Sequence, residues 1–128
     1  MKKAIICVDD ETSILSALQQ QMMRAFGSEY LIEFAERGRE AIELIQELMA
    51  DGYVVSAVIT DEMMPDMRGH MLISEIIKIS PNTKFVLLTG YIDTEVEDNI
   101  KSNPAITYLT KPWEFNELMG EIAGMTLA

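Results

Sequence analysis

The chain has 128 residues and carries 10 Lys and Arg against 21 Asp and Glu, a formal net charge of −11. This length suits a single domain over residues 1–128, and we expect no output domain within it. Such acidity argues against nucleic acid or an anionic membrane as the main partner, because both require a basic surface. One cysteine, Cys7, excludes a disulfide framework, and no apolar run is long enough to span a membrane. We therefore expect a cytoplasmic protein.

Short apolar runs alternate with segments of helical periodicity along the first half of the chain. Residues 4–8 form a continuous apolar run, which is typical of a strand buried on both faces. Apolar residues at helical spacing predict a helix over 14–26, and residues 30–35 predict a second strand. A helix from 38 to 52 and a third strand over 54–60 complete this half.

The second half repeats the same alternation. A helix is predicted over 70–79, followed by a fourth strand over 85–88. A single apolar stripe predicts a short acidic helix over 92–100. A fifth strand over 106–109 and a final helix over 115–122 end the pattern. Five strands alternating with five helices predict an α/β fold, in which helices cover both faces of a parallel sheet.

Polar and charged residues follow several of the predicted strands. Asp9 and Asp10 follow the first strand, Asp61 the third, Thr89 the fourth and Lys111 the fifth. Ligands of open parallel sheets bind outside the carboxyl ends of the strands, so these residues form the candidate site. Neighbouring carboxylates repel one another unless a cation compensates them, and an all-oxygen donor set favours Mg²⁺ over zinc. Since Mg²⁺ usually retains a phosphate oxygen as ligand, the set indicates a phosphoryl site.

Each of these residues also has an ordinary explanation. The acids at 9–11 could form the charged first turn of a helix, because acids stabilise helix N-termini. Asp61 could be a loop acid, Thr89 a turn hydroxyl and Lys111 a surface lysine. Their joint placement is what favours a shared site, and by itself it predicts only a Mg²⁺ site on an α/β sheet. His70, the only histidine, is expected near a helix start and cannot form a histidine cluster.

Four motifs, taken together and in this order, resemble the receiver domains of two-component response regulators. They are Cys7-Val8-Asp9-Asp10-Glu11, the run from Thr60 to Gly69 with Met63-Met64-Pro65, Leu88-Thr89-Gly90 and Thr110-Lys111-Pro112. The resemblance covers nearly the whole chain. It implies the flavodoxin-like (βα)5 three-layer sandwich with a parallel five-stranded sheet of order 2-1-3-4-5. It also implies a signalling module in a phosphorelay that promotes its own phosphorylation and dephosphorylation, and not an enzyme with a separate substrate.

The resemblance assigns roles residue by residue. Asp61 corresponds to the phosphoacceptor, which takes a phosphoryl group from a phosphohistidine on a sensor histidine kinase or a histidine phosphotransfer protein. Asp9 and Asp10, with Asp61 and the backbone carbonyl of Met63, correspond to the ligands of Mg²⁺. Such transfer depends on in-line positioning and charge neutralisation more than on covalent chemistry.

Further positions correspond to residues that bind the phosphoryl group and carry the switch. Thr89 and Lys111 correspond to the groups that contact phosphoryl oxygens, and Thr89 and Tyr108 to the pair that moves on activation. Met63 and Tyr91 occupy the positions that tune loss of the phosphoryl group. Both are bulky and neither orients water well, so we expect self-dephosphorylation to take minutes or longer.

Glu62 departs from the family pattern, which usually has an apolar residue there. We expect its carboxylate to point away from the acidic site, because an inward orientation would put Mg²⁺ affinity in doubt. Residues 91–125 are expected to contact an output protein, or an output domain outside this chain. Whether phosphorylation drives dimerisation stays open.

Two other functions compete with this interpretation. One is a Mg²⁺-dependent small-molecule phosphatase or phosphotransferase that works through an aspartyl phosphate, but Asp61-Glu62-Met63 lacks the Asp-x-Asp pattern of such enzymes. The other is a receiver that binds partners constitutively without phosphorylation. The five site positions, Asp9, Asp10, Asp61, Thr89 and Lys111, all carry the expected residue types, which argues against it.

Overall fold

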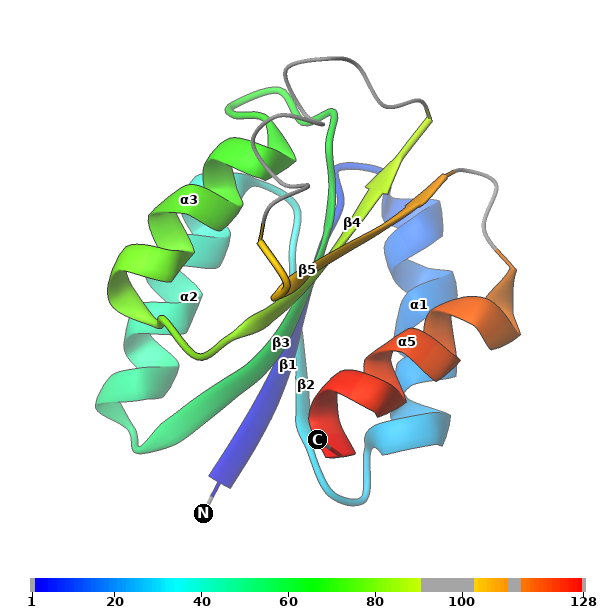
Figure 1. Ribbon diagram of the computed structural model, residues 1–128, viewed down its shortest axis with the longest axis horizontal. Coiled ribbons are helices and arrows are strands. Elements are labelled where there is room, and N and C mark those ends of the chain that lie inside the picture. The colour runs from blue at the N-terminus through cyan, green and yellow to red at the C-terminus, as the bar shows by residue number, and fades with distance from the viewer. Residues whose placement is uncertain (1, 91–102, 111–113, 128) are drawn as a thin grey trace.

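The computed structural model describes residues 2–90, 103–110 and 114–127 (Figure 1). The elements follow one another as β1 (Lys2–Val8), α1 (Thr12–Phe26), β2 (Leu31–Ala35), α2 (Gly38–Ala50), β3 (Tyr53–Asp61), α3 (Gly69–Ile79), β4 (Lys84–Thr89), β5 (Ile106–Thr110) and α5 (Phe115–Leu127). Within the described ranges, every strand and helix expected from the sequence is confirmed. The acidic helix expected over 92–100 lies outside them.

The strands form one parallel sheet in the order β2-β1-β3-β4-β5, which confirms the flavodoxin-like fold. Helices α1 and α5 cover one face of the sheet, and α2 and α3 cover the other (Figure 1). In the part of the chain that the structure describes, no helix is both long and apolar enough to cross a bilayer.

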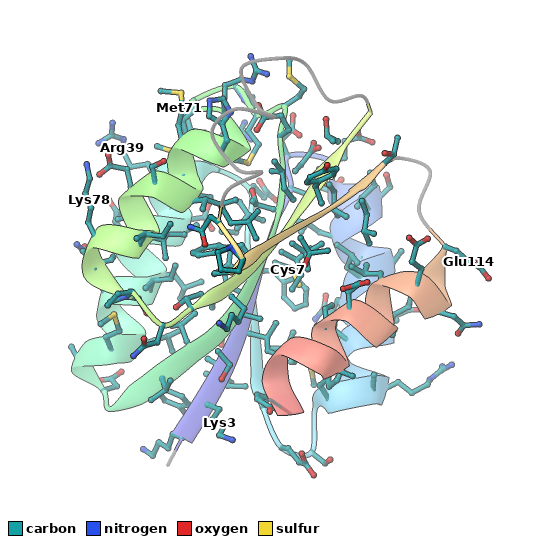
Figure 2. The ribbon with its side chains drawn as sticks, in the orientation of Figure 1. Lys3, Cys7, Arg39, Met71, Lys78 and Glu114 are labelled. Carbon is teal, nitrogen blue, oxygen red and sulfur yellow. The ribbon has the colours of Figure 1, made fainter. Side chains whose placement is uncertain are left out.

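Strand β1, which lies between β2 and β3, is buried on both faces, and its side chains enter two separate core clusters. Ala4, Ile6 and Val8 pack on the side of α2 and α3, whereas Ile5 and Cys7 pack on the side of α1 and α5. This alternation explains why the run is continuously apolar. Figure 2 shows Cys7 in the interior between the helical layers. Burial raises the pKa of its thiol to about 12 because the thiolate is excluded from water.

The register of the sheet brings the carboxyl ends of the strands to one level. Val8 pairs with Ala35 on one side and with Thr60 on the other. Asp61 pairs with Leu88 on β4. Residues that follow β1, end β3 or end β4 therefore emerge side by side at the same edge of the sheet.

Candidate metal and phosphoryl site

Three carboxylates meet at this edge. Asp9, Asp10 and Asp61 each offer an oxygen, and these oxygens lie within 4.8 Å of one another. Asp61 is the last residue of β3 and Asp9 directly follows β1, so two neighbouring inner strands supply the cluster. Asp9 and Asp61 are buried and Asp10 is half-buried. The structure thus brings together the three acids that the sequence predicted as neighbours.

Local hydrogen bonds fix the Asp9 end of the cluster. The Asp9 amide donates to the Ala35 carbonyl at 3.1 Å, which extends the pairing of β1 and β2 by one residue. Its Oδ1 accepts a 2.9 Å bond from the amide of Glu11, just before α1. Both the backbone and the carboxylate of Asp9 are therefore held before any ligand binds.

The donor set fits a magnesium ion. The clustered groups are all carboxylates, and Mg²⁺ prefers such oxygen ligands while it keeps several waters. Carboxylates packed this closely repel one another, and a divalent cation would remove that cost. The acidic cluster is therefore a suitable Mg²⁺ site by its chemistry.

Of the other predicted site residues, the structure describes Thr89, Tyr108 and Met63. Thr89 is the buried last residue of β4, adjacent to the end of β3. Tyr108 pairs with Leu87 and packs against the core on the α2 and α3 side. Thr89 lies two residues after Leu87, so Thr89 and Tyr108 share that face. The side chain of Met63 is 60% exposed. Lys111 and Tyr91 lie outside the described residues.

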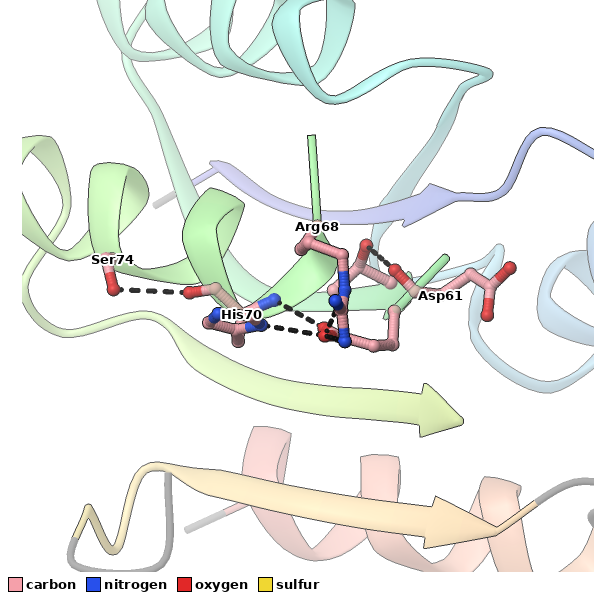
Figure 3. A network of polar contacts seen from close by, with 6 residues as sticks. Asp61, Arg68, His70 and Ser74 are labelled. Atoms are coloured by element: carbon pink, nitrogen blue, oxygen red, sulfur yellow. Dashed lines mark hydrogen bonds and ion pairs between the residues drawn. The ribbon is translucent and has the colours of Figure 1, made fainter. Parts of the chain in front are cut away.

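Glu62 points away from the acidic cluster, as expected from the sequence. Its carboxylate is buried and is bound by Arg68 and His70, whereas the Asp61 side chain extends away from both (Figure 3). His70 does lie at a helix start, as the second residue of α3. Its buried contact with Glu62 was not anticipated.

Asp66, in the same loop, binds the start of a different helix. Its Oδ1 accepts a 3.1 Å bond from the Gly38 amide and its Oδ2 a 2.9 Å bond from the Arg39 amide, at the first turn of α2. Partial desolvation raises the pKa of Asp66, but backbone hydrogen bonds from Arg39, Gly38, Asp66 itself and Met67 outweigh it and lower the pKa below its usual value.

Neither of these caps was predicted from the sequence, although a signal for them was present. Helices α2 and α3 are preceded by Arg37 and Arg68, and neither N-cap residue makes a side-chain capping bond. Arginine is a poor N-cap, since Ser, Thr, Asp and Asn are the residues that bind the free amides. An N-cap residue without a capping side chain leaves the first amides of its helix open to acceptors from elsewhere in the chain.

A five-stranded parallel sheet with clustered carboxylates at its carboxyl edge places the protein in the flavodoxin-like class of α/β domains. The response regulator receiver domain family matches residues 5–123. The chain is 34% identical over 115 residues to the chemotaxis protein CheY of Thermotoga maritima, covering 89% of each. It is 30% identical over 122 residues to the sensor kinase CckA of Brucella abortus, covering 94% of this chain and 12% of that protein.

A solved receiver domain from Clostridium thermocellum superposes with a TM-score of 0.82 at 26% identity, covering 99% of this chain and 95% of that one. The chain spans only about an eighth of CckA and 25% of the Escherichia coli regulator ZraR. It belongs to the response regulator receiver domain family. It is a signalling domain of two-component systems, in which phosphorylation on aspartate is the general mechanism.

Proposed function

We propose that Asp61 is the phosphoacceptor of this receiver. The observation that carries the proposal is the carboxylate cluster at the end of β3, where Asp61 is buried beside Asp9 and Asp10. An Asp61 carboxylate oxygen would attack the phosphorus of a phosphohistidine. A new O–P bond forms while the N–P bond breaks, and its electron pair returns to the imidazole ring of the donor.

Asp9, Asp10, Asp61 and the backbone carbonyl of Met63 would hold Mg²⁺. The ion would neutralise charge on the phosphoryl oxygens, which is the main requirement of such transfer. Asp9 is already fixed by its bond from the Glu11 amide, so this ligand needs little rearrangement. Asp61 is buried at the end of β3, beside these ligands, so it would attack from the same place at which the ion is bound.

Thr89 and Lys111 would bind the remaining phosphoryl oxygens. Movement of the Thr89 hydroxyl toward the phosphoryl group would change the packing on the face that it shares with Tyr108. The pairing of β4 and β5 supports this switch: Leu87 pairs with Tyr108, and Thr89 lies two residues further along β4 on the same face of the sheet. Met63 and Tyr91 would leave the aspartyl phosphate poorly exposed to oriented water, so self-dephosphorylation would take minutes or longer.

The phosphoryl donor would be a sensor histidine kinase or a histidine phosphotransfer protein. Residues 91–125 would contact an output protein or an output domain. Seven acids between residues 93 and 128 favour a basic or apolar protein partner. A cytoplasmic location is part of this proposal, because the only cysteine is a buried free thiol.

Acetyl phosphate with Mg²⁺ provides the test. Wild type should gain the mass of one phosphoryl group, and Asp61→Asn should gain none. Asp51→Asn is the matched control, because Asp51 is an exposed aspartate at the end of α2. The proposal fails when Asp61→Asn is phosphorylated as fully as wild type, or when wild type stays unmodified. Hydrolysis of small phosphate esters by the wild type would instead favour a phosphatase.

A further inference from the structure

The Glu62 carboxylate forms a network of polar contacts with Arg68 and His70, away from the acidic cluster. Oε1 accepts a 2.8 Å bond from the backbone amide of His70. Oε2 lies 2.7 Å from Nδ1 of His70 and accepts a 2.8 Å bond from Nε of Arg68, with Nη2 of Arg68 also at 2.8 Å (Figure 3). Glu62 is only 1% exposed, so water screens these contacts little.

These contacts close the base of a loop. The Glu62 carbonyl also accepts a 2.9 Å bond from the Gly69 amide, and the Glu62 amide donates a 2.9 Å bond to Leu88 on β4. Residue 62 is therefore bound to the sheet on one side and to residues 68–70 on the other. Residues 63–67 lie between these fixed points, and Met63 is the first of them.

The same carboxylate caps α3. Arg68 at the N-cap provides no side-chain acceptor, and Glu62 binds the free amide of His70 in the first turn. A negative charge at a helix N-terminus is also favoured by the helix dipole. The first turn of α3 is thus connected directly to the residue that follows Asp61.

The charge on Glu62 does not add to that of the acidic cluster. Consecutive residues at a strand end point to opposite sides, so the carboxylates of Asp61 and Glu62 diverge. The guanidinium of Arg68 neutralises Glu62 on its own side. Where the family usually has an apolar residue, this chain has a buried and compensated acid.

We propose that Glu62 is a positioning residue for the metal site. By closing the loop, its carboxylate holds the Met63 carbonyl where it can act as a Mg²⁺ ligand beside Asp61. The inference rests on the proposed function and adds a residue that touches neither the ion nor the phosphoryl group. Groups that orient metal ligands without contacting the metal often change metal affinity by about 10- to 100-fold when they are replaced.

Isothermal titration of Mg²⁺ against purified variants tests this inference. Glu62→Leu should weaken Mg²⁺ binding about tenfold or more. Glu62→Gln should weaken it less, because the amide oxygen can still accept the His70 N–H. Asp66→Ala is the matched control: it removes a cap from the same loop, but one bound to α2. It should lower Tm while leaving the Mg²⁺ Kd within about twofold of wild type. A change that small is below the roughly 10-fold or greater loss of affinity expected when a ligand-orienting group is replaced.

Thermal unfolding separates affinity from stability. Titrations well below Tm use protein that is almost entirely folded, so a purely structural role of Glu62 would lower Tm without changing Kd. Arg68→Leu serves if Glu62→Leu does not unfold cooperatively, because the Arg68 side chain is 33% exposed; it too should weaken Mg²⁺ binding.

The inference is overturned if substitution of Glu62, or of Arg68 where that variant is used, leaves the Mg²⁺ Kd unchanged. It is also overturned if Asp66→Ala weakens Mg²⁺ binding as much as the Glu62 substitution does. Failure of wild type to bind Mg²⁺ or to accept acetyl phosphate would instead overturn the proposed function.

Discussion

Gly69 lies against the backbone carbonyl of Asp61 so closely that no side chain fits between them. A Cβ at position 69 would collide with the Asp61 carbonyl oxygen and would come within 2.8 Å of Leu87 Cδ1. The collision is with backbone, which cannot swing aside as a flexible side chain can. The first residue of α3 therefore has to be glycine for Asp61 to keep its place.

Gly69→Ala should lower the free energy of unfolding by about 1–3 kcal/mol, the usual cost of overpacking. The closely matched change Gly120→Ala, in α5, meets nothing within 4 Å. It should stabilise the protein by up to about 1 kcal/mol, because alanine favours helix over glycine. Urea denaturation measures both changes. A Gly69→Ala protein as stable as wild type would contradict the close approach.

Asp10→Asn should have opposite effects with and without Mg²⁺. In EDTA it removes one of three mutually repelling charges, which should stabilise the fold by about 1 kcal/mol. Saturating Mg²⁺ at about 100 times Kd should stabilise wild type by about 2.7 kcal/mol, and the variant far less. Tm measured in both buffers tests this, with Asp51→Asn as control. Equal Mg²⁺ shifts in wild type and Asp10→Asn would exclude Asp10 as a ligand.

The Asp66 cap should make stability depend on acid pH. Its folded pKa is below the ordinary value of 3.8, so the ionised form stabilises the fold. That contribution is present above pH about 4 and is lost as pH falls through the folded pKa.

Asp66→Ala should cost about 1 kcal/mol at neutral pH, the usual value of an N-cap. The difference between wild type and variant should shrink once Asp66 is protonated. Denaturation at neutral pH and at pH about 3 checks this. A constant difference at both pH values would show that the charge of Asp66 does not matter.

Cys7 should be inert in the folded protein. Its thiol is buried and its pKa is raised from 9.0 to about 12, so little thiolate forms at ordinary pH. Iodoacetamide at pH about 8 should label the protein completely in urea and far more slowly without it. Because the unfolded thiol ionises first, stability should fall as pH rises above 9.0 toward about 12. Rapid labelling of the folded protein, detected by intact mass, would contradict the burial of Cys7.

Sequence patterns predicted the sheet and the acidic cluster because both follow from local signals. The apolar run over 54–60 ends in an acid, and parallel strands bring such ends together. The proximity of Asp61 to Asp9 and Asp10 could therefore be predicted from the sequence alone. The order of the strands came from the family resemblance and is confirmed.

Contacts of the loop after Asp61 could not be predicted in the same way. Glu62 reaches His70 only because α3 begins against the end of β3, and that approach depends on tertiary packing. Asp66 reaches Gly38 across 28 positions of sequence. Periodicity describes which face of an element is buried, but it does not say which distant carboxylate will bind a helix start.

The amide hydrogens at the starts of α2 and α3 report on the same loop. Gly38 and Arg39 donate to Asp66, and His70 donates to Glu62, so exchange of these hydrogens with solvent requires their acceptors to move away. The segment after Asp61 consequently cannot open without fraying the starts of two helices. What looks in sequence like a connection between β3 and α3 belongs to the same cooperative unit as both helices.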